Sequence, residues 1–390
     1  MAATSNKKIL FVCHIASRSG APLLLLQIIR EFKKQTTIPF EILLVKEGEL
    51  TAEFKALGKT YSWNKINKIE SGSILVKPVN AMLMLFQFLY QRYILSCFRG
   101  TSTVFLNTII NGEIHHKLLF LKCRFICYVH ELEVSIKIAT RKESLFITIN
   151  KTDLFIACAK AVKNNLVTNH QVFPEKIQVL PAPVNEVHRD KKDYEDFITT
   201  FKKNNNISQN TTVIGVAANN EWRKGVDLFV PLIGVYNNLF PDNKVCFVWK
   251  GFRTNNPSSF FDAFDYEKLV NNKNVVLLPH GADGIETIAC FDIHLLVSRE
   301  DPYPLAILEA ASLGIPTVCF LDAGGAQEFI ENDCGYCTPY GDLVKMAEKL
   351  NVLTTDVNLR NLMGKNAQQK IKLRHENITA IAPFMDLLKN

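Results

Sequence analysis

Two acidic residues, eight positions apart, are the side chains of this chain best suited to chemistry. Asp301 stands before Pro302 and Pro304, and Glu309 lies inside the apolar segment that follows. Proline fixes φ and suits the first turn of a helix, so the pattern predicts a loop that leads into a largely buried helix. Carboxylates so placed can hold the hydroxyls of a sugar or ribose, while backbone N–H groups at the helix start face an anion.

Ordinary capping is the alternative explanation of this pair. An acid at a helix start commonly serves only the helix dipole, and a glutamate within a helix usually faces solvent. Glu309 favours a functional role, because its helix is otherwise apolar and a carboxylate there needs a partner. Gly314 and Pro316 are expected to end the helix, and Thr317–Leu321 is predicted to be a buried strand.

Two adjacent cations, Arg223 and Lys224, follow the predicted strand Thr212–Ala217 and stand just before the predicted helix Gly225–Leu239. A guanidinium beside an ammonium is well suited to neutralise a diphosphate. A solvated turn would show the same pattern, so these residues alone do not establish a diphosphate site.

A loop near the N-terminus carries Arg18, Ser19, Gly20 and Ala21 and enters a helix through Pro22. Such a loop exposes backbone N–H groups to an anion, and Arg18 can add its charge. The loop matches neither the dinucleotide-binding glycine fingerprint nor a P-loop. The pattern therefore indicates an anion site of no particular class.

His130 follows the predicted strand Arg124–Val129, and Glu131 and Glu133 come close behind it. A histidine at this place can hydrogen-bond a sugar or transfer a proton, although a single histidine is more often structural. Residues 323–328 form a further glycine loop that enters a helix after a strand.

Strands and helices alternate along the chain in two blocks. Further runs predicted as strands are Ile9–Cys13, Glu41–Val45, Thr103–Leu106, Leu154–Ala157 and Ile177–Leu180, then Val245–Lys250, Val275–Leu278 and Ile293–Val297. Further helices are predicted over Pro22–Lys34 and Ala326–Glu331, and the polar residues 190–210 between the blocks are predicted to be a connector. The pattern predicts two doubly wound α/β domains, whose ligands bind beyond the carboxyl ends of strands, where the loops above all lie.

The composition is that of a globular protein in a reducing compartment. Of the 390 residues, 47% are apolar and 21% are charged, which fits about two domains and excludes disordered and collagen-like classes. The ten cysteines are scattered through apolar runs, as reduced and buried thiols are, so a cytoplasmic location is predicted.

The charge is uneven along the chain. Residues 1–190 hold 25 Lys and Arg against 14 Asp and Glu, whereas the remainder holds 20 against 24. A basic N-terminal half suits an anionic partner, such as a membrane surface or a phosphate-bearing acceptor, so peripheral contact with the inner face of the cell membrane is a further expectation. No basic and aromatic array resembles a nucleic-acid module, which excludes nucleic acid as a partner.

The longest apolar stretch, Val79–Phe98, is interrupted by Gln87, Gln91 and Arg92 and is a poor spanning segment. We expect it to form a buried helix. A helix that lies on a membrane surface is the alternative.

In this order and spacing, the motifs resemble those of GT-B-fold glycosyltransferases, specifically the retaining glycosyltransferase family 4. The resemblance covers essentially the whole chain, and residues 298–314 are its most specific part. It implies two Rossmann-like domains that face each other across a cleft. Residues 1–188 would bind the acceptor, residues 189–368 would bind a nucleotide sugar, and residues 369–390 would belong to a final helix, roughly Asn366–Leu388, that crosses back to the first domain.

The resemblance also implies residue roles. The family's pair of acids falls on Asp301, which would contact the donor sugar, and on Glu309, which would contact the ribose. Its diphosphate-binding lysine falls on Lys224, and His130 matches a position that often faces the sugar. The expected catalytic residues are therefore Asp301, Lys224, Arg223 and His130. The expected donor-binding residues are Ser19, Gly20, Ala21, Asn219, Arg253, His280, Pro304, Leu305 and Glu309, and the expected acceptor side is Arg18, Glu131 and Glu133.

Two positions depart from the family pattern. The first acid is Asp301 rather than a glutamate, and Glu300 beside it can compete for the role. The family's arginine falls on Asn219, so Arg223 or Arg253 must supply that charge.

The expected reaction moves a sugar from a UDP- or GDP-linked donor to a hydroxyl of a glycan or lipid-linked acceptor, with retention, in bacterial lipopolysaccharide or capsule synthesis. The family attacks from the face that the leaving group departs, and the departing phosphate takes the acceptor proton. No cofactor and no metal are expected, because no Asp-x-Asp motif stands in a suitable position. The alternatives are a nucleotide-sugar epimerase on the same fold and a catalytically silent protein that binds glycan.

Overall fold

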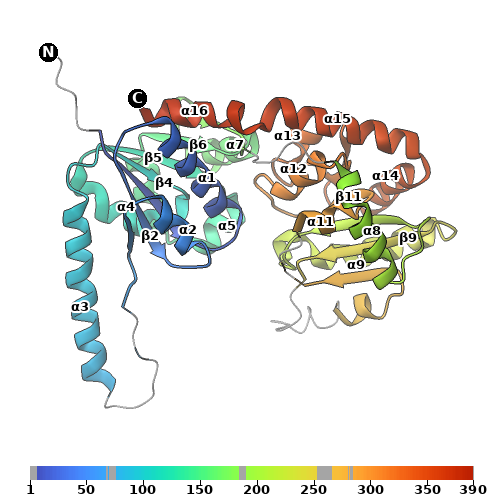
Figure 1. Cartoon of the computed structure of the whole chain (residues 1–390), viewed down its shortest axis with the longest axis horizontal. Coiled ribbons are helices and arrows are strands. Elements are labelled where there is room, and N and C mark those ends of the chain that lie inside the picture. The colour runs from blue at the N-terminus through green and yellow to red at the C-terminus, as the bar shows by residue number, and fades with distance from the viewer. Residues whose placement is uncertain are drawn as a thin grey trace. The chain divides into compact units, whose positions relative to one another are not determined.

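The computed structural model describes residues 7–66, 69, 76–183, 190–252, 266–279, 281 and 284–389, with the backbone alone for residues 377–379. The chain divides into two compact units, which are coloured by position along the chain in Figure 1. Unit 1 comprises Met1–Leu180 and Ile381–Asn390, and unit 2 comprises Pro181–Ala380. The sequence places the domain boundaries after residues 188 and 368, whereas the chain leaves unit 1 after Leu180 and returns to it at Ile381.

In the described part of unit 1, seven parallel strands form one sheet in the order β3-β2-β1-β4-β5-β6-β7. The strands are β1 (Ile9–Ile15), β2 (Phe40–Lys46), β3 (Thr60–Ser62), β4 (Thr103–Leu106), β5 (Arg124–Val129), β6 (Leu154–Ala157) and β7 (Ile177–Val179). The α-helices between them are α1 (Gly20–Gln35), α2 (Thr51–Leu57), α3 (Val76–Cys97), α4 (Gly112–Leu118), α5 (Glu133–Ala139), α6 (Lys142–Lys151) and α7 (Lys160–His170). Most of the strands are short runs rich in Val, Ile, Leu and Phe, and residues 9–13 of β1 are fully buried, as expected of a parallel sheet covered on both faces.

Unit 2 repeats this design. Its described strands order as β10-β9-β8-β11-β12-β13, all parallel, with β8 (Thr212–Ala217), β9 (Val245–Lys250), β10 (Val275–Leu278), β11 (Ile293–Leu296), β12 (Thr317–Phe320) and β13 (Gly335–Thr338). The α-helices are α8 (Glu195–Asn204), α9 (Val226–Leu239), α11 (Gly284–Ala289), α12 (Leu305–Ser312), α13 (Ala326–Ile330), α14 (Leu343–Thr355) and α15 (Val357–His375).

Both sheets reverse their strand order at one point. In unit 1 the order reverses between β1 and β4, and in unit 2 between β8 and β11. At such a switch point the connecting loops part on opposite sides, which opens a crevice at the carboxyl ends of the two strands. The prediction of two doubly wound α/β domains is confirmed.

Residues 190–210, predicted to be a connector, instead contain α8. Phe197, Ile198 and Phe201 recur at helical spacing and pack against the core of unit 2. Glu195 lies in the first turn and Lys202 in the last, where each charge complements the helix dipole. The high proportion of charged residues hid this periodicity.

The final helical segment is two helices rather than one over Asn366–Leu388. α15 ends at His375 and α16 (Asn377–Lys389) begins two residues later, because Glu376 between them takes an extended ψ of 133°. The last part of α16 packs into unit 1, where Phe384 is fully buried and its ring centroid lies 5.2 Å from that of Tyr128.

The long apolar stretch predicted as a buried helix is α3, and that prediction is wrong. Of the side chains of α3, only Ile94 is fully buried, and most of the other large apolar ones are exposed. Within the described residues, no helix is both long and apolar enough to cross a membrane.

Candidate active site

The carboxyl ends of β8 and β11 lie side by side at the switch point of unit 2, and both lead into polar loops. After β8, residues 218–221 lead into a short 3-10 helix, η5 (Trp222–Lys224), and then into α9. After β11, residues 297–304 lead into α12. This edge is where doubly wound sheets bind their ligands, so we place the candidate donor site here.

Lys224 and Asp301, two of the predicted catalytic residues, form an ion pair across these loops. The Lys224 Nζ bonds Asp301 Oδ2, and the two side chains are only 17% and 6% exposed. A carboxylate this buried needs a charged partner, which Lys224 provides. Because an ammonium has three N–H donors, Lys224 can hold Asp301 and still donate to a phosphate.

A glycine loop after β12 fixes the backbone of Asp301. The Asp301 N donates to Ala323 O (2.7 Å), and the Gly325 N donates to Asp301 O (3.2 Å). Between them, Gly324 has a φ of +133°, and a Cβ there would lie 1.8 Å from Asp301 O. Only glycine fits such an approach, so the loop singled out from the sequence at residues 323–328 positions the acid.

Arg223 is turned toward the loop after β11. Its Nη1 donates to Glu300 O (3.0 Å), its Nη2 lies 3.5 Å from Glu221 Oε2, and its carbonyl accepts from Arg299 N (2.9 Å). Asn219, in the loop after β8, donates from Nδ2 to Glu221 Oε1 (3.4 Å). The two loops are therefore tied together by Arg223, and its role toward a diphosphate stays a prediction.

Arg299 is a residue of this site that the sequence reasoning missed. Its two terminal nitrogens donate to the two carboxylate oxygens of Asp227 at 2.5 and 2.6 Å, and its guanidinium lies over the Trp222 ring, 4.7 Å from the centroid. A bidentate pair of this kind holds the start of α9 against the loop after β11. Trp222 and Asp227 belong to one motif, but no spacing in the sequence marks a partner 72 residues from Asp227.

Ser298 was also missed. Its side chain is buried at the end of β11, and its Oγ has no hydrogen-bond partner among the residues that the structure describes. A buried hydroxyl in this position is normally satisfied by a water or a ligand.

α12 begins at Leu305, with Pro304 as its N-cap residue, and buries Ile307 and Leu308. Glu309 lies on the exposed side of this helix. The helix is apolar and largely buried, as predicted, but Glu309 itself is exposed. Its exposed position instead suits contact with a ligand that approaches from solvent.

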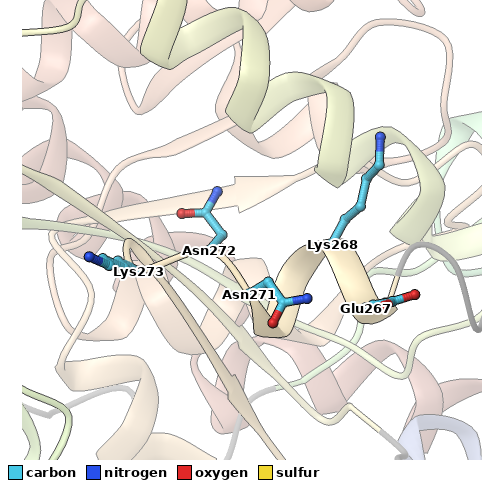
Figure 2. A pocket seen from close by; sticks show the side chains of 5 residues that line it. All are labelled: Glu267, Lys268, Asn271, Asn272 and Lys273. Atoms are coloured by element: carbon cyan, nitrogen blue, oxygen red, sulfur yellow. The ribbon is translucent and has the colours of Figure 1, made fainter.

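Arg253 and His280, two predicted donor-binding residues, lie outside the described residues. Figure 2 shows a hollow near them in the sequence, lined by Glu267, Lys268, Asn271, Asn272 and Lys273. These residues precede β10 and so lie at the amino end of that strand. Since ligands of doubly wound sheets bind at the opposite edge, we do not assign the donor site to this hollow.

The switch point of unit 1 carries the N-terminal loop. α1 begins at Gly20, and Ser19 before it does not cap the helix with its side chain, because its Oγ bonds Ser17 Oγ (2.9 Å). Ala21 O accepts from Asn107 Nδ2 (2.8 Å), which fixes the start of the helix to the end of β4. The role of Ser19, Gly20 and Ala21 toward an anion stays a prediction.

Arg18, by contrast, is paired with acids of its own unit. Its Nη2 bonds Glu53 Oε1 (2.7 Å), and its backbone N donates to Glu49 Oε2 (2.9 Å). Glu133, another predicted acceptor-side residue, contacts Lys137 Nζ (3.0 Å) and His170 Nε2 (2.9 Å). The roles of Arg18 and Glu133 toward an acceptor stay predictions.

His130 lies at the carboxyl end of β5, where its Nε2 donates to Asn107 Oδ1 (3.3 Å) and its ring packs on Tyr128. Burial lowers the pKa of His130 to about 3, although part of the residue remains accessible. The imidazole is therefore neutral at physiological pH. It can hydrogen-bond a sugar hydroxyl, but it does not bring a positive charge to the site.

Glu131 is buried beside His130 and bonds Thr108 Oγ1, while its Oε2 accepts from His130 N (3.0 Å). Burial raises the pKa of Glu131 to about 7, against the lowering effect of these hydrogen bonds. Asn107 and Thr108 complete this polar cluster and were missed, although polar residues directly after the strand Thr103–Leu106 were a usable signal.

The Glu131→Gln variant should change how stability depends on pH. Because the folded-state pKa of about 7 lies above the unfolded value of 4.5, folding takes up a proton between these values. Wild-type stability therefore falls as pH rises from 4.5 to 7, by about 3 kcal/mol at most. The glutamine cannot ionise. The free energy of unfolding of the variant, measured with urea, should therefore rise relative to that of wild type between pH 4.5 and pH 8. A constant difference between the two proteins would contradict this.

Comparison with known proteins identifies the larger part of unit 2. Residues 197–370 match the model of the family described as "Glycosyl transferases group 1". This range contains the Lys224–Asp301 pair, Glu309 and the glycine loop around Gly324. Residues 197–370 form a glycosyl transferases group 1 domain. The resemblance to glycosyltransferases found from the sequence motifs is confirmed, and the assignment to the retaining family 4 stays a prediction.

Three curated proteins are 23% to 30% identical to this chain over the residues that align. The capsular polysaccharide biosynthesis glycosyltransferase CapM of Staphylococcus aureus is 23% identical over 57% of both chains. The N,N'-diacetylbacillosaminyl-diphospho-undecaprenol alpha-1,3-N-acetylgalactosaminyltransferase of Campylobacter jejuni is 30% identical over 46% of this chain and 45% of its own. The UDP-Gal:alpha-D-GlcNAc-diphosphoundecaprenol alpha-1,3-galactosyltransferase of Escherichia coli is 26% identical over 63% of this chain and 64% of its own. This chain thus spans less than two thirds of each relative's length.

Solved structures resemble the whole chain, beyond the group 1 domain. HepE from Anabaena, in crystals with UDP and glucose, aligns with a TM-score of 0.76 and 17% identity over 98% of this chain and all of its own. Sucrose-phosphate synthase from Thermosynechococcus elongatus aligns with a TM-score of 0.73 and 14% identity over 98% of each chain. At such identities the likeness shows the fold, and the predicted GT-B architecture of two Rossmann-like domains is confirmed.

Proposed function

We propose that this protein is a retaining glycosyltransferase that moves a sugar from a UDP- or GDP-linked donor to a hydroxyl of a glycan or lipid-linked acceptor. The observation that carries the proposal is the shielded Lys224–Asp301 pair at the switch point of a group 1 domain. A nucleotide donor is supported by the UDP and UDP-glucose in the HepE crystals. A role in bacterial surface polysaccharide synthesis is supported by the names of the relatives.

Lys224 is the group that stabilises the leaving diphosphate. Cleavage of the bond between the anomeric carbon and the diphosphate places negative charge on the departing oxygen and positive character on the sugar. An ammonium already fixed in a shielded site meets the developing negative charge without reorganisation, which is the kind of effect that dominates many enzymes. The N-terminus of α12 adds backbone N–H groups, which carry partial positive charge.

Asp301 orients the sugar from the same place. Its Oδ2 is held by Lys224, and its backbone is fixed by the loop of Gly324, so the carboxylate can accept hydrogen bonds from sugar hydroxyls with little loss of entropy. No second carboxylate is proposed as a nucleophile. The acceptor hydroxyl attacks from the face that the diphosphate leaves, and its proton passes to a phosphate oxygen as the new glycosidic bond forms.

His130 and Glu131 are proposed to lie on the acceptor side of the reaction. The His130 imidazole is neutral there, and the Glu131 carboxyl, with a pKa of about 7, can exchange a proton near neutral pH. The reaction is proposed to need no metal. Among the described residues, no three His, Cys, Asp or Glu side chains gather closely enough to hold one, and activity in excess EDTA tests this part directly.

Glu309→Ala should raise the KM for the donor about 10- to 100-fold and leave kcat within a few-fold. The reason is that an exposed carboxylate that accepts from a ribose diol contributes charged hydrogen bonds to the ground state and transition state alike. Steady-state kinetics with varied donor check this. Glu348→Ala, which removes an exposed acid of α14, is the matched control and should leave KM unchanged. A Glu309→Ala enzyme with wild-type KM would remove the ribose assignment.

A panel of UDP- and GDP-sugars tests the proposal as a whole. The true donor at 100 times its Kd should stabilise the folded protein by about 2.7 kcal/mol, which a thermal shift detects. Slow release of free nucleotide from that donor supports a transferase. An isomer of the donor sugar would point to an epimerase, and the absence of any shift across the panel would point to a silent protein.

A further inference from the structure

α3 contacts unit 1 partly through polar side chains and turns most of its large apolar side chains to solvent. Its Gln87 donates from Nε2 to Trp63 O (2.6 Å) and accepts at Oε1 from Ile66 N (2.9 Å). Asn80, two turns earlier, accepts at Oδ1 from Ile69 N (2.8 Å). These bonds to backbone groups hold the helix in one rotation about its axis. The outward apolar face is therefore set by the polar contacts on the inward side.

The outward face carries large apolar side chains along most of its length. Between 40% and 61% of each is exposed: Val79, Met82, Met84, Leu85, Phe86, Phe88, Leu89 and Tyr93. In Figure 1 the first half of α3, in light blue, extends beyond the sheet of unit 1 with no other labelled element in front of it or behind it. Soluble monomers rarely leave an apolar patch of this extent in water, so the face is expected to be covered.

The width of the face indicates what covers it. At 100° per residue, the exposed apolar side chains span about 200° of the helix circumference. A partner helix covers a stripe of about 100°, as in ridge-and-groove packing between helices. A fluid apolar phase can surround the full arc. Flexible Met and Leu side chains beside Phe also suit a surface with no fixed shape.

The charges select the kind of lipid. α3 contains no acidic residue, and its two cations, Lys77 and Arg92, are exposed near its two ends. Residues 71–112 contain no Asp or Glu at all. Long basic side chains at the ends of an apolar surface helix can reach phosphate headgroups while the middle of the helix inserts.

We propose that α3 lies in the surface of an anionic lipid bilayer and anchors unit 1 there, with Phe86, Phe88 and Leu89 inserted and Arg92 among the headgroups. This proposal stands on α3 and does not depend on the transferase activity. The basic N-terminal half as a whole was expected to attract an anionic membrane. The proposal instead assigns the membrane contact to one helix and to a defined face of that helix.

Co-sedimentation of the full chain with vesicles tests the proposal. Wild type should bind vesicles of phosphatidylglycerol and phosphatidylcholine. A triple variant, Phe86→Gln with Phe88→Gln and Leu89→Gln, should bind at least about tenfold more weakly, because three inserted side chains lose their apolar transfer energy. Arg92→Gln should weaken binding about fivefold, and pure phosphatidylcholine should bind more weakly than the mixture.

The matched control replaces three exposed apolar residues of unit 2, Val357, Leu362 and Leu373 of α15, with glutamine. It should bind vesicles as wild type does, and circular dichroism should show both triple variants folded. Wild type that ignores anionic vesicles, or a triple variant of α3 that binds them unchanged, would overturn the proposal. So would sedimentation velocity that shows a wild-type dimer which the α3 variant abolishes while vesicle binding persists. Nucleotide release from a soluble donor is measured separately, so failure of the anchor does not mimic failure of the transferase.

Discussion

Replacing Lys224 with alanine is expected to lower kcat about 100- to 1,000-fold. The ammonium is the cation nearest to Asp301 at the switch point, and loss of one fixed donor to developing charge typically has this effect. The variant also leaves the nearly buried Asp301 carboxylate without its partner, which should reduce the free energy of unfolding by about 2–4 kcal/mol. Nucleotide-release kinetics and urea unfolding measure the two effects separately.

A double variant separates catalysis from stability. Lys224→Ala with Asp301→Asn removes both charges, so most of the lost stability should return while activity stays low. Lys244→Ala, an exposed cation before β9, controls for the loss of a positive charge in unit 2 and should be as active as wild type. If Lys224→Ala retained full turnover, or if the double variant regained it, Lys224 would not be the group that stabilises the diphosphate.

The fold was predictable because parallel strands leave a strong signal. β4, β5, β6, β8, β9 and β10 begin and end at the predicted residues, since buried strands in a doubly wound sheet are short runs of β-branched and aromatic residues. The prediction was wrong where many charged and polar residues obscured the helical spacing of the apolar ones. α8 is rich in charged residues and was taken as a connector, although Phe197 and Phe201 fix its buried side.

α3 shows the opposite limit of prediction from sequence. An apolar run with scattered glutamines predicts a buried helix, because such a run usually supplies the core. Here the polar residues contact backbone groups of the preceding segment, and the apolar residues face outward. Hydropathy measures how apolar a helix is. It does not show which side the fold covers.

The sequence motifs were enough to predict which loops form the site. They were not enough to predict the contacts between side chains of different loops. Lys224 and Asp301 each follow a strand, so their meeting at one edge follows from parallel neighbours. The pairing of Arg299 with Asp227 depends on the side that each loop presents, which only the tertiary structure shows. The bond from Arg223 to Glu300 O, which ties the two loops together, was likewise not marked by any spacing.

Gly324→Ala adds a single methyl group, and it is expected to lower stability and activity more than any other such change in the site. A Cβ at Gly324 would lie 1.8 Å from Asp301 O, and the residue's φ of +133° belongs to a region that L side chains rarely adopt. The loop must therefore move away from Asp301, with a loss of about 3–5 kcal/mol in the free energy of unfolding. Because this loop fixes the acid, activity should fall with stability.

Gly341→Ala is the control that isolates the cause. Gly341 also has a positive φ, +78°, but a Cβ there would meet no atom within 4 Å, so only the backbone cost of about 1–2 kcal/mol applies. Urea unfolding of the two variants should differ by the cost of the clash, and only Gly324→Ala should lose turnover at temperatures where both remain folded. Equal losses in the two variants would mean that positive φ alone matters. The close approach of the glycine loop would then not be what holds Asp301 in place.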